Sequence, residues 1–352
     1  MAQAELESKL TTQADEALAG KRRAGTIRTV IALVVLAVVI IIVDVFTQGE
    51  FLTAGNITNV LRQITYNTIL AVGQTFVIIT AGIDLSVGSI VGLGGVVCAL
   101  FANAVPLPGV LLLIASLVVA IVLGGIAGFV NALPVVRLGL PPFITTLAMM
   151  QIARGFAYIL SSGRPVALNQ NSYNAFQNTG IGYVLSGPLS LFRLPGIPIA
   201  VIWMAVIVVV FAIVLARTRF GRYVYAIGGN EEAARLAGVS VGTVKTMVYV
   251  ISGALAAIAG LLLMARFSSG SPQTGLGFEL NAIAAVVVGG TSLMGGRGMI
   301  LGTFFGALLI GVLNNVMDLI GIESYTQQIV LGVVIVTAVI IDELRKRFLA
   351  RK

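Results

Sequence analysis

Residues 29–46 read TVIALVVLAVVIIIVDVF, and this stretch decides the fold class. Its length of about 18 residues approaches the roughly 20 apolar residues with which an α-helix crosses a bilayer. Similar runs recur along nearly the whole chain of 352 residues, of which 58% are hydrophobic and 10% are charged. A water-soluble domain, with roughly 25% charged residues, could not bury that much apolar surface. We therefore expect an all-α polytopic membrane protein.

The first apolar run follows a basic stretch that contains Lys21, Arg22, Arg23 and Arg28. The run is too long for the core of most signal peptides, and it lacks an obvious small-residue cleavage site. We expect it to stay attached as the first span.

Because backbone polar groups inside a bilayer must be paired within each helix, the apolar runs predict about ten transmembrane helices in one continuous domain. The expected spans are 29–46, 61–80, 87–104, 109–133, 143–161, 198–216, 246–266, 280–293, 299–319 and 326–342. The expected parts are a polar tail at 1–28, a transmembrane domain at 29–342 with an outer loop at 162–197 and an inner loop at 217–245, and a basic C-terminus at 343–352.

Lysine and arginine are distributed unevenly between the two sides of this arrangement. An even number of spans places both termini on one side, and cytoplasmic segments carry the excess of basic residues. Assigning both termini, the loops at Arg137 and Arg297 and the loop 217–245 to the cytoplasm places 17 of the 22 basic residues there. We therefore expect both termini in the cytoplasm.

Composition excludes several function classes. The net charge of +8 comes from basic residues scattered singly at the ends of apolar runs, so no nucleic-acid partner is expected. Cys98 is the only cysteine, which excludes an intrachain disulfide and a thiolate metal cluster. Because the chain has no histidine, a His-based triad and an HExxH zinc site are also excluded. We expect no catalytic residue, no metal and no cofactor in this chain.

The inner loop contains GNEEAARLAG at 229–238, which predicts a short helix from Asn230 to Ala237. Asn230 is a good N-cap, acidic residues in the first turn suit the helix dipole, and Gly238 suits the C′ position. Ala233, Leu236 and Ala237 share one face. That face would meet headgroups, the chain's own spans or a cytoplasmic partner.

A second segment, TAGIDLSVGS at 80–89, separates two apolar runs. A carboxylate near the membrane interior is costly, so Asp84 is a functional candidate. We prefer the interpretation that Asp84 and Ser86 cap the third span.

The third segment, VVVGGTSLMGGRGMILG at 286–302, is rich in glycine. It does not match the Walker pattern, because Gly296 and Arg297 occupy the positions where Lys and Ser or Thr are needed. The glycines are better explained by close helix packing or by an interrupted helix beside a pathway.

Four stretches resemble the permease subunits of ribose-type bacterial ATP-binding cassette sugar importers. They are GIDLSVGSIVGL (82–93), LPPFITTLAMMQIARGFAYILSSGRPV (140–166), GRYVYAIGGNEEAARLAGV (221–239) and VVVGGTSLMGGRGMILGTFFGALLIGVLNN (286–315). The resemblance covers nearly everything from about residue 50 onward.

The resemblance implies a type II importer fold in a bacterial inner membrane. It also implies a cytoplasmic ATPase subunit that binds ATP and Mg, a second permease copy, and a periplasmic or lipid-anchored sugar-binding protein. The inner-loop helix then corresponds to the coupling helix that contacts the ATPase. Its residues are Asn230, Glu231, Glu232, Ala233, Ala234, Arg235, Leu236 and Gly238.

The main alternative is an ion-coupled secondary transporter, which requires ion-coordinating groups near mid-membrane. Asp44, Asp84 and Asp318 are the acidic residues expected near spans, each at a span end, so such groups are scarce. Ribose, another small sugar or a polyol all fit as substrate. Side chains expected along the pathway or at its gate are Asn67, Gln74, Asp84, Ser86, Asn281, Asn314 and Asn315.

Overall fold

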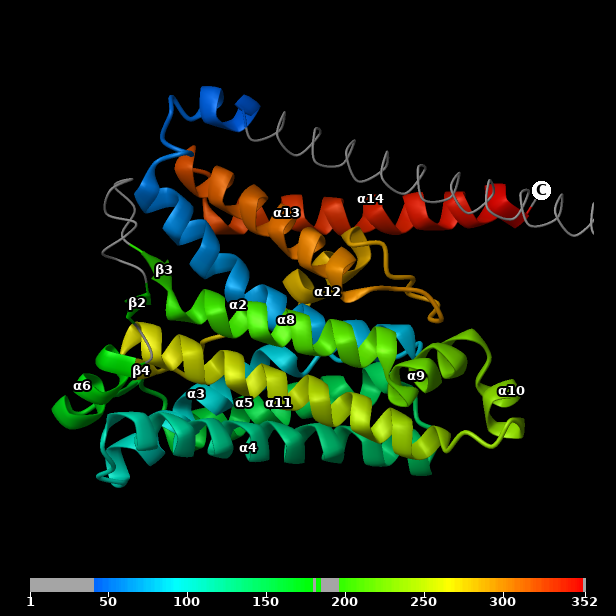
Figure 1. Cartoon of the computed structure of the whole chain (residues 1–352), viewed down its shortest axis with the longest axis horizontal. Helices are drawn as coiled ribbons and strands as arrows, with labels where there is room; N and C mark the ends of the chain where they lie inside the picture. Colours follow the sequence, from blue (N-terminus) through cyan, green and yellow to red (C-terminus); the bar gives the residue numbers. More distant parts are fainter. Residues whose placement is uncertain (1–40, 180–181, 185–195, 351–352) are drawn as a thin grey trace, which may run out of the picture. The chain divides into compact units, whose positions relative to one another are not determined.

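The computed structural model describes residues 41–179, 182–184 and 196–350, with side chains described at 41–176, 182 and 196–340 (Figure 1). The chain divides into two units, Met1–Thr53 and Ala54–Lys352. In the first unit, residues 41–46 are helical and lead into a turn, where the backbone N–H of Leu52 donates to Asp44 Oδ1 at 2.9 Å. Most of the expected first span lies outside the described residues.

The second unit is built almost entirely of helices. These are α2 (Ala54–Ile79), α3 (Val87–Ala104), α4 (Gly109–Arg137), α5 (Pro142–Leu160), α6 (Gln170–Thr179), α8 (Ile199–Arg217), α9 (Arg219–Gly229), α10 (Glu231–Leu236), α11 (Val241–Phe267), α12 (Phe278–Val288), α13 (Ile300–Leu319) and α14 (Ser324–Ala350). The short strands form two antiparallel pairs. Strand β1 (Val166–Ala167) pairs with β4 (Ser269–Gly270), and β2 (Tyr183–Val184) pairs with β3 (Ile197–Pro198). The all-α class is confirmed.

Six described helices, α3, α4, α5, α8, α11 and α13, are long and apolar enough to cross a membrane. Helices α4, α5 and α8 leave most of their side chains exposed, as expected for helices that face lipid, whereas α3 and α11 are largely buried. The predicted spans at 61–80 and 326–342 lie almost wholly within α2 and α14, which are longer, and the span at 280–293 overlaps the shorter α12. The total of ten spans stays a prediction.

Close packing of α4 against α11 depends on small residues. A Cβ on Gly124 or Gly128 would overlap the backbone of Gly253 or Tyr249 on α11, and a Cβ on Gly253 would overlap the backbone of Gly124. Such backbone approach is how membrane helices associate without a hydrophobic driving force between them. The glycines therefore bring α11 into the centre of the bundle.

Helix α12 is a half-length helix. After α11 the chain turns back along α3, so that Gly270 abuts the backbone of Gly95, and Gly275 abuts that of Gly88. Only then does α12 begin, and its 11 residues span about 16 Å, roughly half of the hydrocarbon core. The expected span 280–293 is therefore too long, because the helix ends at Val288.

The two ends of the second unit carry different elements (Figure 1). Helices α9 and α10 lie at one end, at the right of the view, and α6 lies with the paired strands at the other. Helices α12, α13 and α14 form one side of the bundle, on the far side of α2 from α4 and α11.

Candidate functional site

The helix expected in the inner loop is present as α10. Asn230 caps it, because its Oδ1 accepts the backbone N–H of Ala233 at 3.0 Å. Ala237 is the C-cap, and Gly238 follows with a φ of +82° in the left-handed region that favours glycine. The predicted start and end are therefore both confirmed.

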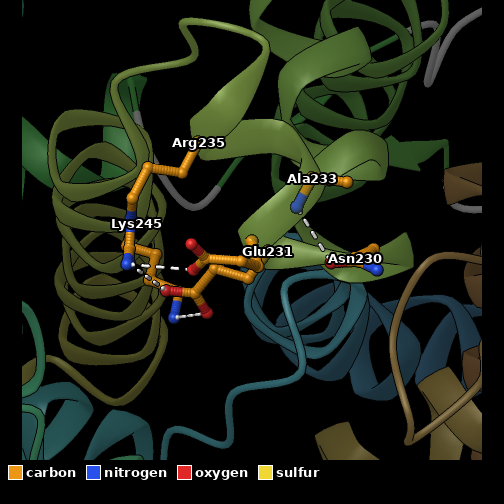
Figure 2. Close-up of polar contacts among 6 residues, drawn as sticks. Asn230, Glu231, Ala233, Arg235 and Lys245 are labelled. Atoms are coloured by element: carbon orange, nitrogen blue, oxygen red, sulfur yellow. Dashed lines mark hydrogen bonds and ion pairs between the residues drawn. The ribbon is translucent and has the colours of Figure 1, made fainter.

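Charged side chains fasten α10 to the start of α11 (Figure 2). Arg235 pairs with Glu232 at 3.2 Å and with Glu231 at 3.3 Å, while Lys245 of α11 reaches Glu231 at 2.6 Å. The pairs within α10 are exposed and contribute little to stability. Lys245 is mostly buried, with 18% of its side chain exposed, so its pair is the one that orients the helix. Helical spacing predicts the pairs of Arg235, but not the contact across the loop.

One face of α10 is apolar and uncovered. Ala233, Leu236 and Ala237 are all exposed, and Leu236 has 82% of its surface accessible. Ala234 is buried and its carbonyl accepts the N–H of Val239 at 3.0 Å, so it holds the helix in place. The chain thus presents small apolar side chains outward from a helix anchored on its other face.

Helix α9 connects α10 to the membrane helices. Its Gly228 packs against the carbonyl of Ile79, at the end of α2, and against the N–H of Gly296 in the glycine-rich loop between α12 and α13. Gly296 N–H donates to the Ile79 carbonyl at 2.9 Å, and Tyr225 Oη–H of α9 donates to the carbonyl of Gly298 at 2.7 Å. Close backbone approach, one of the roles expected for these glycines, is therefore what the loop shows. A displacement of α9 would act directly on α2 and on this loop.

A polar centre lies at the break between α2 and α3. Asp84 is fully buried, and its Oδ1 accepts from the backbone N–H of Ser86 at 3.0 Å and from its hydroxyl at 2.6 Å. Ser252 of α11 donates to Asp84 Oδ2 at 2.8 Å, and Asn131 of α4 donates to the Ser86 hydroxyl at 2.8 Å. Gln74 of α2 donates to the Asp84 carbonyl at 3.0 Å. Three helices therefore converge on this turn.

The expected cap of the third span is only partly correct. Ser86 is the N-cap residue of α3, but its side chain makes no capping bond to the helix, because its hydroxyl turns toward the Asp84 carboxylate. Asp84 satisfies one amide only, that of Ser86 itself. Within the described chain no Lys or Arg pairs with Asp84, so hydroxyl and amide donors stabilise the carboxylate.

Two buried or half-buried charged residues, Arg154 of α5 and Glu279 of α12, were not among the site residues expected from the sequence. Arg154 lies inside α5, and its guanidinium donates to the carbonyls of Pro272 and Thr274, in the segment that leads into α12. Glu279 lies in the first turn of α12, where its carboxylate fills the space that a Cβ on Gly88 would need. A charge within an apolar run was the available signal for Arg154.

The expectation that three aspartates are the only acidic residues near spans is wrong, because Glu279 belongs to α12. Asp318 lies near the end of α13 and accepts from Gln327 at 2.7 Å. No described group of three or more Asp, Glu or Cys side chains could hold a metal ion.

The remaining pathway candidates fall into separate places. Asn315 forms a reciprocal amide pair with Asn56 of α2, at 2.8 and 2.9 Å. Asn67 is buried in α2, with no partner for its Oδ1 among the described residues. Asn281 and Asn314 line a common cavity between α12, α13 and α14. The structure thus brings together only Gln74, Asp84 and Ser86 in one group, and Asn281 with Asn314 in another.

The family of proteins described as branched-chain amino acid transport system / permease component matches residues 56–339. The chain belongs to this permease family.

Curated relatives of this permease resemble it over nearly their whole length. Ribose import permease protein RbsC of Haemophilus influenzae is 42% identical over 316 residues, which cover 90% of this chain and 92% of the relative. The protein of that name from Bacillus subtilis is 42% identical over 87% of this chain and 90% of its own. Fructose import permease protein FrcC of Rhizobium meliloti is 37% identical over 89% of this chain and 84% of its own. No solved structure matches the permease.

These similarities confirm the resemblance to ribose-type importer permeases and make the chain a multi-pass membrane component of a transport system. The exposed face of α10 and the contacts of α9 therefore belong to a component of a transport system.

Proposed function

We propose that this permease is the membrane subunit of an ATP-binding cassette importer that carries a small monosaccharide or polyol, ribose-like in size, into the cytoplasm. The observation that carries the proposal is the 42% identity to ribose import permeases over about nine-tenths of both chains. A separate ATPase subunit would bind ATP and Mg, and a periplasmic or lipid-anchored binding protein would deliver the sugar.

The test is uptake of radiolabelled ribose into proteoliposomes that contain the permease, its ATPase subunit and its binding protein. Uptake should require ATP inside the vesicle and should persist when proton and sodium gradients are abolished. Uptake that follows an ion gradient without ATP would instead establish the secondary-transporter alternative.

We also propose that the permease acts as a homodimer in the bacterial inner membrane, with both termini in the cytoplasm. The excess of basic residues in the termini and in the loop around α10 supports this orientation. With Cys98 replaced by alanine, an impermeant thiol reagent outside intact cells should label Asn174→Cys on α6 and not Glu232→Cys on α10. The mass of the purified complex would give the number of permease copies.

The outward face of α10 is the proposed contact with the ATPase. It combines small exposed side chains with a helix that is capped at both ends and held by Lys245. Through α9 this helix abuts the end of α2 and the glycine-rich loop, so ATP-driven movement of the partner would reach the bundle by direct contact.

Replacing Ala233 with aspartate tests this contact. The charge would be buried without a counter-charge on a partner surface, so ATPase co-purification and sugar uptake should each fall at least about tenfold, equivalent to about 1.4 kcal/mol. Ala233→Ser is the matched control at the same position and should keep both. Because Ala233 is exposed, membrane abundance should not change in either variant. Wild-type co-purification by Ala233→Asp would place the ATPase contact elsewhere.

A further inference from the structure

A cavity of about 400 Å³ lies between α12, α13 and α14. Its volume is within the roughly 300–1,000 Å³ of typical small-molecule sites. It adjoins the first turn of the half-length helix α12, where Gly277 and Asn281 form part of its wall. Interrupted membrane helices often line the substrate sites of transporters. The cavity therefore has both the volume and the setting of a substrate contact.

Four amides line this cavity, and three of them make no side-chain hydrogen bond to a described residue. Asn281 and Asn314 are half-buried, and Gln328 is one turn along α14 from Ser324. None of these three amides makes a side-chain hydrogen bond to any described residue, whereas neighbouring Gln327 donates to Asp318 and to the carbonyl of Ile322. These amides therefore keep donors and acceptors that a ligand from outside the described chain can bond.

The chemistry of the wall selects a neutral ligand. No described residue that lines the cavity carries a charge, so the ammonium and carboxylate of an amino acid would enter without counter-charges. Each amide offers a carbonyl acceptor and N–H donors, which match a hydroxyl that both donates and accepts. Leu280, Leu331 and Ile335 supply the apolar part of the wall, suited to the C–H face of a sugar ring.

Hydrogen bonds from Arg154 and from Asn315 fix the position of the two walls of the cavity. Arg154 holds the segment before α12 through two backbone carbonyls, and this segment continues into Leu276 and Gly277 of the cavity wall. On the opposite wall, Asn314 is next to Asn315, whose pair with Asn56 attaches α13 to α2. Both walls are therefore anchored, while the side chains of Asn281 and Asn314 bond no described residue.

We propose that this cavity is a contact site for the neutral, hydroxyl-bearing solute during its passage, with Asn281 and Asn314 as the residues that bond its hydroxyls. The inference rests on the proposed sugar import and adds the residues that determine its specificity.

Two adjacent asparagines provide the test. In the complete importer with radiolabelled ribose, Asn314→Leu and Asn281→Leu should each lower uptake about tenfold, with unchanged membrane abundance, ATPase co-purification and thermal midpoint. Asn315→Leu makes the same chemical change at the next residue, but breaks the pair with Asn56, so it should lower the thermal midpoint. Wild-type uptake by both Asn314→Leu and Asn281→Leu would overturn the site. No ATP-dependent ribose uptake by the wild-type importer would instead overturn the proposed function on which the site depends.

Thiol labelling gives a readout independent of transport rate. Gly332 lines the cavity and a Cβ there meets no atom within 4 Å, so Gly332→Cys in a Cys98→Ala background should fold normally. Saturating ribose should slow its modification at least about threefold, and leucine should not. Modification unaffected by ribose, or a disulfide between two Gly332→Cys copies, would overturn the proposal, the latter by showing that a second copy closes the cavity.

Discussion

The polar centre at Asp84 and the cavity at Asn281 and Asn314 contain similar side chains in opposite states. At Asp84 the carboxylate accepts three hydrogen bonds from Ser86 and Ser252, and no part of it reaches the surface. At the cavity, Asn281 and Asn314 are half-buried and their side chains bond no described residue. Polar side chains inside a membrane protein can therefore either hydrogen-bond neighbouring helices or keep donors and acceptors available for a solute. The difference is set by whether the fold already supplies their partners.

The largest effect on stability is expected from Asp84→Ala. Three donors would lose their acceptor in a site closed to water, which should lower the free energy of unfolding by about 3 kcal/mol. The measurement is the thermal midpoint of the purified permease in detergent, together with its abundance in membranes. Asp318→Ala is the matched control, because Asp318 is exposed, and it should cost less than about 0.5 kcal/mol. Equal midpoints for the two variants would remove the distinction between a fastening centre and a surface carboxylate.

A smaller effect is expected from the amide pair between α2 and α13. Asn56→Leu and Asn315→Leu should each lower the free energy of unfolding by about 1 kcal/mol, the range measured for hydrogen bonds between membrane helices. The double variant should lose less than the sum of the two, since either single change already removes both bonds of the reciprocal pair. Strict additivity in this cycle, measured by thermal or denaturant unfolding, would show that the pair is not an energetic unit.

The smallest effects are expected at the edge of the cavity. Gln328→Leu and Ser324→Ala remove polar groups that bond no described residue, so each should change the free energy of unfolding by less than about 0.5 kcal/mol. The same unfolding assay checks both. A loss as large as that of Asn315→Leu would mean that these side chains support the fold and that the two regions do not differ in kind.

Much of the architecture could be predicted from apolar runs alone. Eight of the expected spans overlap a described helix over most of their length, although α2 begins earlier and α14 ends later than expected. Helix α12 is shorter than its expected span because the chain first returns along α3. A pattern of glycines allows such a close approach, but does not specify it, since Gly275 meets Gly88 only after the chain has reversed direction. The cap and the C-terminal glycine of α10 could be predicted because both act within one turn of the chain.

The candidate sites show the same difference between features set locally along the chain and features set by tertiary packing. Sequence alone determined that this chain spans membranes, that α10 begins at Asn230 and ends before Gly238, and that few charges enter the apolar segments, because hydropathy and capping are local properties. Only the tertiary structure decided that Ser252, 168 residues from Asp84, completes its hydrogen bonds, and that Asn314 faces a cavity while Asn315 pairs with Asn56. Neighbouring residues on a helix point about 100° apart, so helix packing, not residue type, determines which of them bonds the protein and which remains free for a solute.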